Sequence, residues 1–292
     1  MTKFVMYMGL PGSGKTFIAH QHEKDYVIID SDEVRARILG DATDQSQNAK
    51  VFDHMFKETC ECLARGVNVA YVATNLSMKR RMNLLASLKK KYPETIYACA
   101  LVMAPIDVCH ERNSARERSV PTYVIDRMAR QFDPPCINEG WTYLETIYNY
   151  DRNSFPSYHK KYQDMVENYG SQENSHHTLT LWEHCYNCGT FARNADLSND
   201  IIQAAFLHDY GKAFTAIRWE KDNYKEVHYP NHAEIGSYLA LTMGYGLHIA
   251  QLVRFHMVPY MDEIAQKVWR ARLGEQLWEE IIALHYCDEA SH

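Results

Sequence analysis

The sequence lacks any long hydrophobic run. None of its apolar stretches approaches the ~20 residues that a membrane-spanning helix needs, and no internal repeat or low-complexity tract interrupts the 292 residues. The apolar stretch KFVMYMGL near the start is short, and a glycine-rich loop follows it where a leader's cleavage site would lie. We therefore expect a buried first strand rather than a signal segment, a cytoplasmic location and no membrane partner.

A disulfide framework and an excess of positive charge are also missing. The eight cysteines lie at irregular spacings in a long chain, which favours reduced thiols, and Cys185-x-x-Cys188 has no second pair. Residues 1–152 carry 20 Lys+Arg and 19 Asp+Glu (+1), and residues 153–292 carry 11 and 18 (−7), which together give −6. Of the 15 histidines, 11 fall in the second half, and a half rich in histidine and acid is the composition that a metal site needs.

Short apolar segments alternate with amphipathic ones through the first half of the chain. The segments KFVMYMGL, DYVIID, VNVAYVA and IYACALVMA each precede a helical pattern, which predicts an α/β domain with a parallel sheet covered by helices on both faces. The stretch WTYLETIYNYD fits either a last strand or a helix. After a polar, broken stretch the pattern becomes almost entirely helical. We predict an α/β domain at 1–152, a linker at 153–174 and an all-α domain at 175–292.

A phosphate-binding loop stands between the first predicted strand and the first predicted helix. The stretch GLPGSGKT fits G-x-x-x-x-G-K-[ST] at every position. Its glycines let backbone N–H groups surround phosphates, its lysine reaches the outer phosphates, and its hydroxyl residue helps to hold Mg²⁺. The sequence therefore predicts ATP and Mg²⁺ as cofactors of the first domain. The predicted nucleotide-binding residues are Gly9, Gly12, Ser13, Gly14, Lys15 and Thr16.

Acidic and basic residues after later segments point to phosphoryl transfer onto a hydroxyl. Asp32 follows the second predicted strand, where a carboxylate can take the proton of an attacking hydroxyl, and Arg35 comes one turn later. In RNSARERSVP, Arg112 and Arg116 would share one face of a helix, with Arg118 following, and could clamp an anion. The alternatives are that Asp32 merely begins a helix and that the arginines line a solvated basic helix.

These motifs together resemble the phage-type polynucleotide 5′-kinase family over about residues 1–135. The likeness lies in the phosphate loop, Asp32-x-x-Arg35, the ATNLS stretch with Thr74–Leu76, and the Arg-Asn-Ser-x-Arg lid. The resemblance implies that Asp32 is the general base, that Arg116 contacts the transferring phosphate and that Arg35 contacts the acceptor's phosphate. One departure is Ala73, which stands where the family usually has Asp.

The second half holds a series of histidines and aspartates in predicted helices. FLHDYGK places His208 beside Asp209, where both side chains could touch one metal ion. A single histidine on an apolar helix face is more often a core residue, but several helices that each present one are hard to explain in that way. We therefore predict that these residues bind metal. The predicted ligands are His184, His208, Asp209, His232, His256 and Asp288.

The order of these residues resembles the HD-domain phosphohydrolase superfamily over about residues 174–292. The resemblance implies that His184, His208, Asp209 and Asp288 suffice for one metal, and that His232 and His256 are the additions of two-metal members. Lys212 matches the position that aids phosphate binding or stabilises the leaving group. Oxygen and nitrogen ligands suit Mn²⁺, Ni²⁺, Co²⁺, Mg²⁺ or Fe²⁺. His176 and His177 fit either a substrate contact or a surface position.

Adding and removing phosphate at one position would be futile, so we expect the two sites to act on different ends. The joined architecture resembles bifunctional end-healing enzymes, in which the hydrolase clears a 2′,3′-cyclic or terminal phosphate and the kinase phosphorylates a 5′-hydroxyl. The substrate would be RNA (perhaps tRNA) or DNA ends, contacted over a few nucleotides, with a functional link to a ligase. Two alternatives remain: a kinase–phosphohydrolase for small nucleosides or nucleotides, and a sensor in which bound ATP regulates the hydrolase. The sequence leaves the oligomeric state open.

Overall fold

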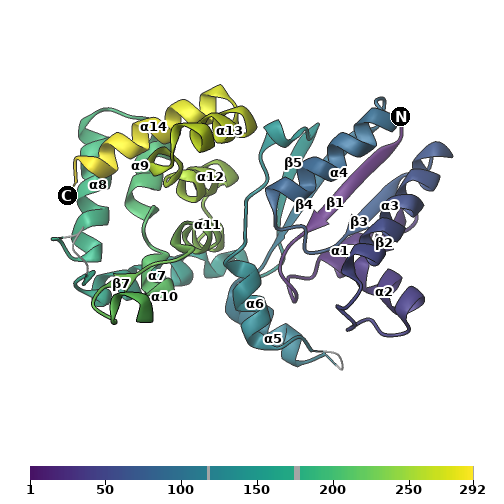
Figure 1. The fold of residues 1–292 in the computed structure, drawn as a ribbon, viewed down its shortest axis with the longest axis horizontal. Coiled ribbons are helices and arrows are strands. Elements are labelled where there is room, and N and C mark those ends of the chain that lie inside the picture. Colours follow the sequence, from purple (N-terminus) through teal and green to yellow (C-terminus); the bar gives the residue numbers. More distant parts are fainter. Residues whose placement is uncertain (117–118, 174–177, 292) are drawn as a thin grey trace. The chain divides into compact units, whose positions relative to one another are not determined.

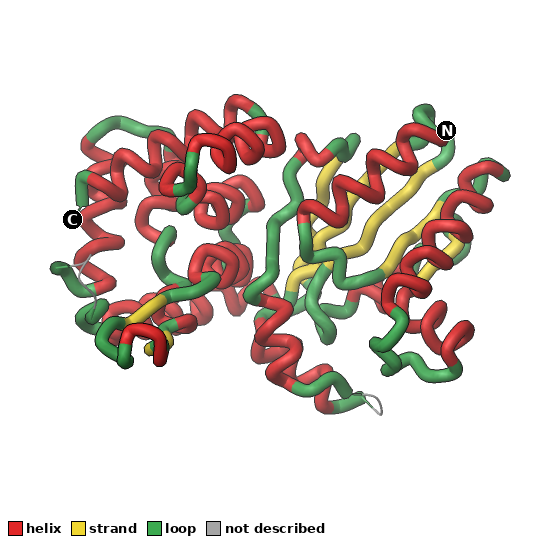
Figure 2. Tube along the Cα trace, viewed as in Figure 1, coloured by secondary structure: helices red, strands yellow, loops and turns green. Residues whose placement is uncertain are grey.

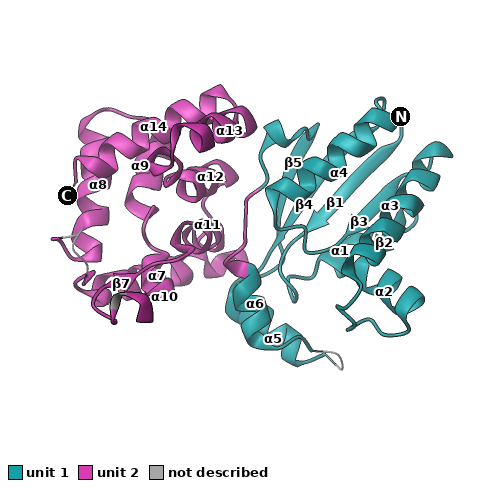
Figure 3. Ribbon diagram, viewed as in Figure 1, with its two compact units in different colours: residues 1–128, 135–150 teal, residues 129–134, 151–292 magenta. Residues whose placement is uncertain are grey.

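The computed structural model divides the chain into two compact units. Unit 1 holds residues 1–128 and 135–150, and unit 2 holds residues 129–134 and 151–292 (Figure 3). The structure describes residues 1–116, 119–173 and 178–291, apart from the side chain of Asp222. The ribbon in Figure 1 follows both units from the N-terminus to the C-terminus.

Unit 1 is built around a five-stranded parallel sheet in the order β2-β3-β1-β4-β5. The predicted α/β class is confirmed, and the stretch WTYLETIYNYD supplies the edge strand β5. Within the described residues its strands are β1 Lys3–Met8, β2 Val27–Asp30, β3 Val69–Val72, β4 Ile96–Met103 and β5 Tyr143–Tyr148. Its helices are α1 Lys15–His20, α2 Ser31–Leu39, α3 Asn48–Ala64, α4 Met78–Lys91, α5 Ile106–Ser114, α6 Thr122–Ala129 and the 3-10 turn η1 Ile137–Glu139.

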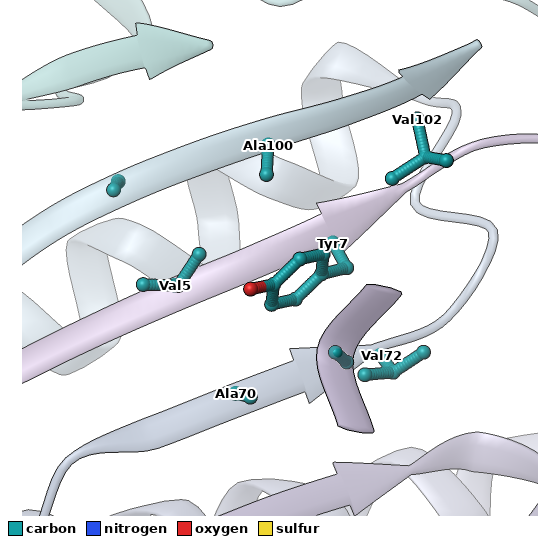
Figure 4. Packing of buried hydrophobic residues seen from close by; sticks show 8 residues of the cluster. Val5, Tyr7, Ala70, Val72, Ala100 and Val102 are labelled. Atoms are coloured by element: carbon teal, nitrogen blue, oxygen red, sulfur yellow. The ribbon is translucent and has the colours of Figure 1, made fainter. Parts of the chain in front are cut away.

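The central strands of the sheet are buried on both faces. On one face, Val5 and Tyr7 of β1 pack between Ala70 and Val72 of β3 and the alanines and valine of β4 (Figure 4). Residues on the opposite face, such as Met6, are also removed from solvent. Burial on both faces explains why these strands read as continuous apolar runs in the sequence rather than as alternating patterns.

A buried ion pair fixes the segment that follows β3. Arg81 of α4 is 1% exposed, and its guanidinium lies 2.6 Å and 2.7 Å from the two carboxylate oxygens of Glu139. The same guanidinium donates to the carbonyl oxygens of Asn75 and Leu76 at 2.9 Å and 3.0 Å. Glu139 in turn accepts from Trp141 Nε1. The two buried charges compensate each other, so neither is left unpaired. The hydrogen bonds from Arg81 to the two carbonyl oxygens hold the ATNLS stretch in place.

Unit 2 is mostly helical, as predicted, and Figure 2 shows its helices in red. Its longer helices are α7 Phe155–Tyr169, α8 Leu181–Asn194, α9 Asn199–Leu207, α11 His232–Thr242, α12 Leu247–Phe255, α13 Glu263–Leu273 and α14 Glu275–Glu289. Its shorter elements are η2 Arg152–Ser154, α10 Lys212–Thr215, β6 Ile217–Arg218, η3 Glu220–Asp222, β7 Val227–His228 and η4 Val258–Tyr260. Strands β6 and β7 form a small antiparallel ribbon.

The partition of the chain differs from the expected boundaries in two places. Residues 153–174, expected to be a linker, hold α7, which buries Tyr162 and Val166 within unit 2. Residues 129–134, expected inside the first domain, also belong to unit 2. There Phe132 is fully buried, with its ring edge-on to Tyr238 at 5.1 Å. In both segments a few apolar side chains are buried in the core of unit 2, and for Phe132 the partner residue is distant in the sequence.

All eight cysteines carry free thiols. In the described part of the chain, none of the helices has the length and apolar character needed to cross a membrane.

Candidate functional site

The phosphate loop follows β1 and leads into α1, as the sequence predicts. Gly12 and Gly14 have φ angles of 86° and 90°, in the left-handed region that favours glycine. A side chain at either position would also collide with a neighbour, since a Cβ atom would lie 2.4 Å from the Cys109 carbonyl oxygen at Gly12 and 2.0 Å from Asn149 Nδ2 at Gly14. The glycines therefore permit both the backbone path and the close packing of this loop.

Lys15 and Thr16 lie at the start of α1. Lys15 Nζ donates to the carbonyl oxygen of Leu10 at 3.3 Å, so the lysine folds back over the loop. Burial lowers the pKa of Lys15, and nearby Asp30 and Asp32 oppose that effect. Thr16 Oγ1 donates to Asp30 Oδ2 at 2.8 Å. A buried carboxylate thus meets the hydroxyl that is expected to help hold Mg²⁺.

Asp30 and Asp32 occupy different environments at the end of β2. Asp30 is 4% exposed and caps α2 by accepting from the Asp32 backbone N–H at 2.7 Å. The Asp32 side chain is 71% exposed and pairs with Arg35 Nη1 at 2.7 Å. Arg35 itself is buried and also donates to the Ala42 carbonyl oxygen and to Asn48 Oδ1. An accessible carboxylate and a buried one therefore flank the loop, and sequence reasoning identified only the accessible one.

The predicted arginine lid is only partly helical. Helix α5 ends at Ser114, so Arg112 lies in its last turn and Arg116 follows beyond it. The two arginines therefore do not share a helix face as expected, because the helix ends at Ser114. Arg116 is close enough to Lys15 to contribute to the lowering of its pKa. Among the described residues, Arg112 Nη1 is buried without a hydrogen-bond partner, and Arg118 is not one of these residues.

The ATNLS stretch contacts the phosphate loop through a backbone carbonyl and β1 through a side chain. The Gly9 N–H donates to the Thr74 carbonyl oxygen at 3.1 Å, and Asn75 Nδ2 donates to the Tyr7 carbonyl oxygen at 3.0 Å. Ala73 is 1% exposed. Since Asp30 and Val72 are paired across β2 and β3, the carboxylate of Asp30 stands one strand away from this position.

Asn149 is a second residue that sequence reasoning missed. It follows β5, and its Nδ2 donates to the Ser13 carbonyl oxygen at 2.8 Å, across 136 residues of sequence. The backbone N–H of Asn149 donates to the Met103 carbonyl oxygen. No local motif marks an asparagine that supports a loop so distant in the chain. The only available signal was its place at the carboxyl end of a predicted parallel strand.

The six predicted metal ligands come together in unit 2 as two groups. Within each group, the candidate ligand atoms all lie within 4.8 Å of one another. Asp209 stands between the groups and turns one carboxylate oxygen toward each. The first group is His184, His208 and Asp288, and the second is Asp209, His232 and His256.

The distances around Asp209 describe this arrangement. Asp209 Oδ2 lies 3.4 Å from His184 Nε2 and 3.3 Å from His208 Nε2. Asp209 Oδ1 lies 3.3 Å from His232 Nε2 and 3.7 Å from His256 Nε2. If each group held a cation, a carboxylate with an oxygen facing each histidine pair could serve both groups.

Three of the histidines are held in the orientation that a ligand requires. Nδ1 of His208, His232 and His256 lies 2.7–2.8 Å from the backbone carbonyl oxygen three residues earlier. A carbonyl only accepts, so in the neutral imidazole Nδ1 carries the proton and the Nε2 lone pair faces the site. The Nε2 atoms of His232 and His256 lie 3.3 Å apart, and two such lone pairs repel unless a cation lies between them. The donor set therefore fits divalent metal ions.

Three ligands lie at or just beyond helix ends rather than inside helices as expected. Helix α9 ends at Leu207, so His208 caps it and Asp209 begins the following turn. His256 likewise caps α12, which ends at Phe255. A turn can aim two adjacent side chains at one point, whereas a continuing helix would separate them by about 100°.

The charge states of the site follow from burial and from its neighbours. Burial alone would raise the pKa of the Asp209 carboxyl, but the Lys212 ammonium and His208 hold that pKa well below its usual range. For Asp288, burial is likewise outweighed by His208 and by hydrogen bonds from His184, so its pKa is lowered. Burial lowers the pKa of His232 to about 3, so that imidazole stays neutral. Ionised carboxylates and neutral imidazole are the forms that bind metal. Although burial opposes it, Asp209 and Asp288 raise the pKa of His184 and of His208, so metal binding would displace protons from these two rings.

Gly211 and Lys212 explain the rest of the HDYGK stretch. A Cβ atom at Gly211 would lie 2.0 Å from the His232 carbonyl oxygen, so only glycine lets α11 approach this turn. Lys212 is buried, and its Nζ lies 2.6 Å from Asp209 Oδ2. Tyr260, which the sequence did not single out, donates its hydroxyl to Asp288 Oδ2 at 2.9 Å. His176 and His177 lie outside the described residues.

Comparison with known families agrees with this division of sites. Residues 4–135 match the model of an AAA domain, and residues 181–290 match the model of an HD domain. Each half of the chain thus matches one of these two family models. The expected pairing of a P-loop kinase domain with an HD domain is therefore confirmed, and both families indicate an enzyme. The AAA domain implies ATP, and the HD domain implies divalent metal.

Solved structures show more distant likenesses. One is the structure of the Pnkp1/Rnl/Hen1 RNA repair complex, at 20% identity and a TM-score of 0.38, covering 44% of this chain and 43% of that one. Another is a gluconokinase from Sinorhizobium meliloti 1021, at 16% identity and a TM-score of 0.36, covering 51% of this chain and 83% of that one. The chain thus spans less than half the length of the RNA-repair structure that it matches. None of the curated proteins compared with the chain matches it.

Proposed function

We propose that the chain is a bifunctional nucleic-acid end-healing enzyme. In this proposal the AAA domain transfers the γ-phosphate of ATP to a 5′-hydroxyl, and the HD domain hydrolyses a 2′,3′-cyclic or terminal phosphate on the other end of an RNA or tRNA break. The observation that carries the proposal is Asp209, whose two oxygens face two histidine pairs, in a chain that also has a phosphate loop. Because the two sites would act on different ends of the break, neither reaction would reverse the other.

In the proposed kinase reaction, Lys15 binds the outer phosphates, and Thr16 with Asp30 holds Mg²⁺. The acceptor hydroxyl gives its proton to the exposed carboxylate of Asp32 as its oxygen bonds to the γ-phosphorus, and the bond to the β-phosphate oxygen breaks to release ADP. Arg116 and Arg112 stabilise charge on the transferring group. Arg35 orients Asp32 through their ion pair and, by family resemblance, contacts the acceptor's phosphate.

In the proposed hydrolase reaction, Asp209 and the five ligands around it would hold one or two divalent ions such as Mn²⁺, Ni²⁺, Co²⁺ or Fe²⁺. Such ions would polarise the phosphate and lower the pKa of water. Lys212 supplies positive charge beside Asp209 for the phosphate or for the departing 2′- or 3′-oxygen. Water oxygen bonds to phosphorus, one ester bond breaks, and the sugar oxygen takes a proton.

A kinase–phosphohydrolase for small nucleosides or nucleotides is the second candidate. The charge balance favours it, because residues 1–152 carry only +1 and residues 153–292 carry −7. Proteins that track a nucleic-acid backbone usually present a basic surface. The end-healing proposal accommodates this balance if only the terminal nucleotides are bound.

One experiment separates the two candidates. The protein is incubated with ATP, Mg²⁺ or Mn²⁺ and an oligoribonucleotide that carries a 5′-hydroxyl and a 2′,3′-cyclic phosphate, in parallel with free nucleosides and nucleotides. We expect a labelled 5′-phosphate and loss of the cyclic phosphate on the oligonucleotide. No change at either oligonucleotide end would rule out end healing, and turnover of the free compounds alone would establish the second candidate.

A further inference from the structure

Gln172 lies beside the HD-domain site although it precedes the matched residues 181–290. It sits in the segment between α7 and α8, next to the isolated bridge that pairs Ser171 with Thr180. Its exposed fraction is 0%. A fully buried glutamine in a connecting segment requires an account of each of its polar atoms.

Two of these atoms are fixed by contacts to the site. Gln172 Oε1 accepts from Lys212 Nζ at 3.0 Å, and the same ammonium lies 2.6 Å from Asp209 Oδ2. The backbone carbonyl oxygen of Gln172 accepts from the hydroxyl of Tyr229. The Lys212 ammonium therefore contacts both the Gln172 amide and the carboxylate of Asp209.

The side-chain nitrogen, Gln172 Nε2, is buried and has no hydrogen-bond partner among the described residues. Leaving a buried donor unsatisfied costs roughly 1–3 kcal/mol. The amide cannot turn over to solve this, because its N–H groups would then face the Lys212 ammonium. A donor held in this orientation fits an acceptor that arrives with a ligand.

We propose that Gln172 is a substrate-binding residue whose Nε2–H donates to a non-bridging oxygen of the phosphate in the HD domain. The proposal rests on the proposed phosphohydrolase function. Phosphate oxygens only accept, and the neighbouring Lys212 supplies the positive charge that an anion needs. Hydrogen bonds to an ionised acceptor are about twice as strong as neutral ones. Gln172 and Lys212 thus form a two-point donor for one phosphate group.

Two substitutions separate donation to phosphate from support of Lys212. Gln172→Glu keeps an acceptor for the Lys212 ammonium but removes the N–H donor. Gln172→Met removes both groups without adding charge. Gln203→Met is the matched control, since Gln203 is a half-buried glutamine of α9 outside both sites.

The test measures binding of inorganic phosphate to the full chain loaded with Mn²⁺, by calorimetry. We expect both Gln172 variants to raise the Kd for phosphate about tenfold, with the metal content per chain unchanged and Gln203→Met like the wild type. Wild-type affinity in Gln172→Glu would overturn the proposal, because an acceptor alone would then suffice. Failure of the wild type itself to bind phosphate would instead overturn the proposed hydrolase function, and this proposal with it.

A second measurement needs no substitution. In the ¹⁵N-labelled wild-type protein, the side-chain amide resonance of Gln172 should shift when phosphate is added, while that of Gln203 stays in place. An unmoved Gln172 resonance at saturating phosphate would overturn the proposal even if both variants failed to fold.

Discussion

The Arg254 guanidinium meets the Asp133 carboxylate at 2.8 Å and 2.9 Å across 121 residues of sequence. The same guanidinium lies 3.0 Å from Glu234, and all three side chains are about 15% exposed or less. Arg254 precedes His256 by two residues, and Glu234 follows His232 by two. The ion pairs therefore connect the elements that carry the second histidine pair with the returning segment 129–134.

Replacing Arg254 should destabilise the HD domain. Arg254→Ala leaves two carboxylates partly buried without their cation, which should lower the free energy of unfolding by about 2–3 kcal/mol. Arg254→Lys keeps the charge but loses the two-pronged contact, so its effect should be smaller. Urea denaturation with a spectroscopic probe in unit 2 measures the change. Equal losses in both variants would show that the charge is unimportant.

Glycine at position 211 should be indispensable for the geometry of the metal site. Gly211→Ala places a methyl group against the His232 carbonyl oxygen, which should cost roughly 1–3 kcal/mol or more and displace His232. Gly246→Ala is the control, because nothing lies within 4 Å of the position of its Cβ atom. We expect lower metal content and a lower melting temperature only in Gly211→Ala. Normal metal content in that variant would refute the steric argument.

The two catalytic functions should be separable by single substitutions. Asp32→Ala removes the exposed proton acceptor and should lower kinase kcat by about 10²–10⁴-fold while the hydrolase is unaffected. Asp209→Ala should do the reverse, because it removes the carboxylate that faces both histidine pairs. The assay follows each end of one doubly labelled oligonucleotide. Loss of both activities from either change would instead indicate a sensor in which the domains are coupled.

Metal stoichiometry should distinguish the two ligand groups. We expect two divalent ions per wild-type chain, and one after either His184→Ala or His256→Ala, because each variant removes a ligand of one group only. Elemental analysis of dialysed, Mn²⁺-supplemented protein gives the count, and His248→Ala, outside both groups, serves as the control. A single ion in the wild type would contradict the bridging interpretation of Asp209.

Binding of ATP should weaken at alkaline pH. Burial lowers the pKa of Lys15 in the free protein, and bound phosphates would raise that pKa because they favour the ammonium. Between the two pKa values, binding requires proton uptake, so the Kd for ATP should rise with pH. Titrations from pH 7.5 upward measure this, and Lys15→Met should lose the dependence. A wild-type Kd that stays flat over the whole range would contradict it.

Contiguous and periodic patterns made much of the molecule predictable. The phosphate loop occupies eight consecutive residues, and its backbone conformation follows from glycines that tolerate positive φ angles. Apolar runs in the sequence predicted the buried parallel strands. The α/β class of the first domain and the change to helices in the second could therefore be predicted. The six metal-ligand candidates were found because histidine and aspartate recur in the order that the HD superfamily shows.

Contacts between residues far apart in the chain were not predictable in the same way. Asn149 donates to the Ser13 carbonyl oxygen from 136 residues away, and Asp30 both caps α2 and accepts from Thr16. No spacing rule marks such pairs, because their distance depends on how whole strands and helices pack. Residues 129–134 belong to unit 2 for the same reason. Phe132 packs against Tyr238, and Asp133 forms an ion pair with Arg254.

The sequence by itself thus determined the residue types of both sites, the order of the ligands and the class of each domain. Only the tertiary structure decided that Asp209 directs one oxygen to each histidine pair, that Asp32 is accessible while Asp30 is buried, and that Gln172 stands beside Lys212. Residue types and short spacings can be read directly from the sequence. The direction and burial of a side chain instead follow from packing between distant parts of the chain.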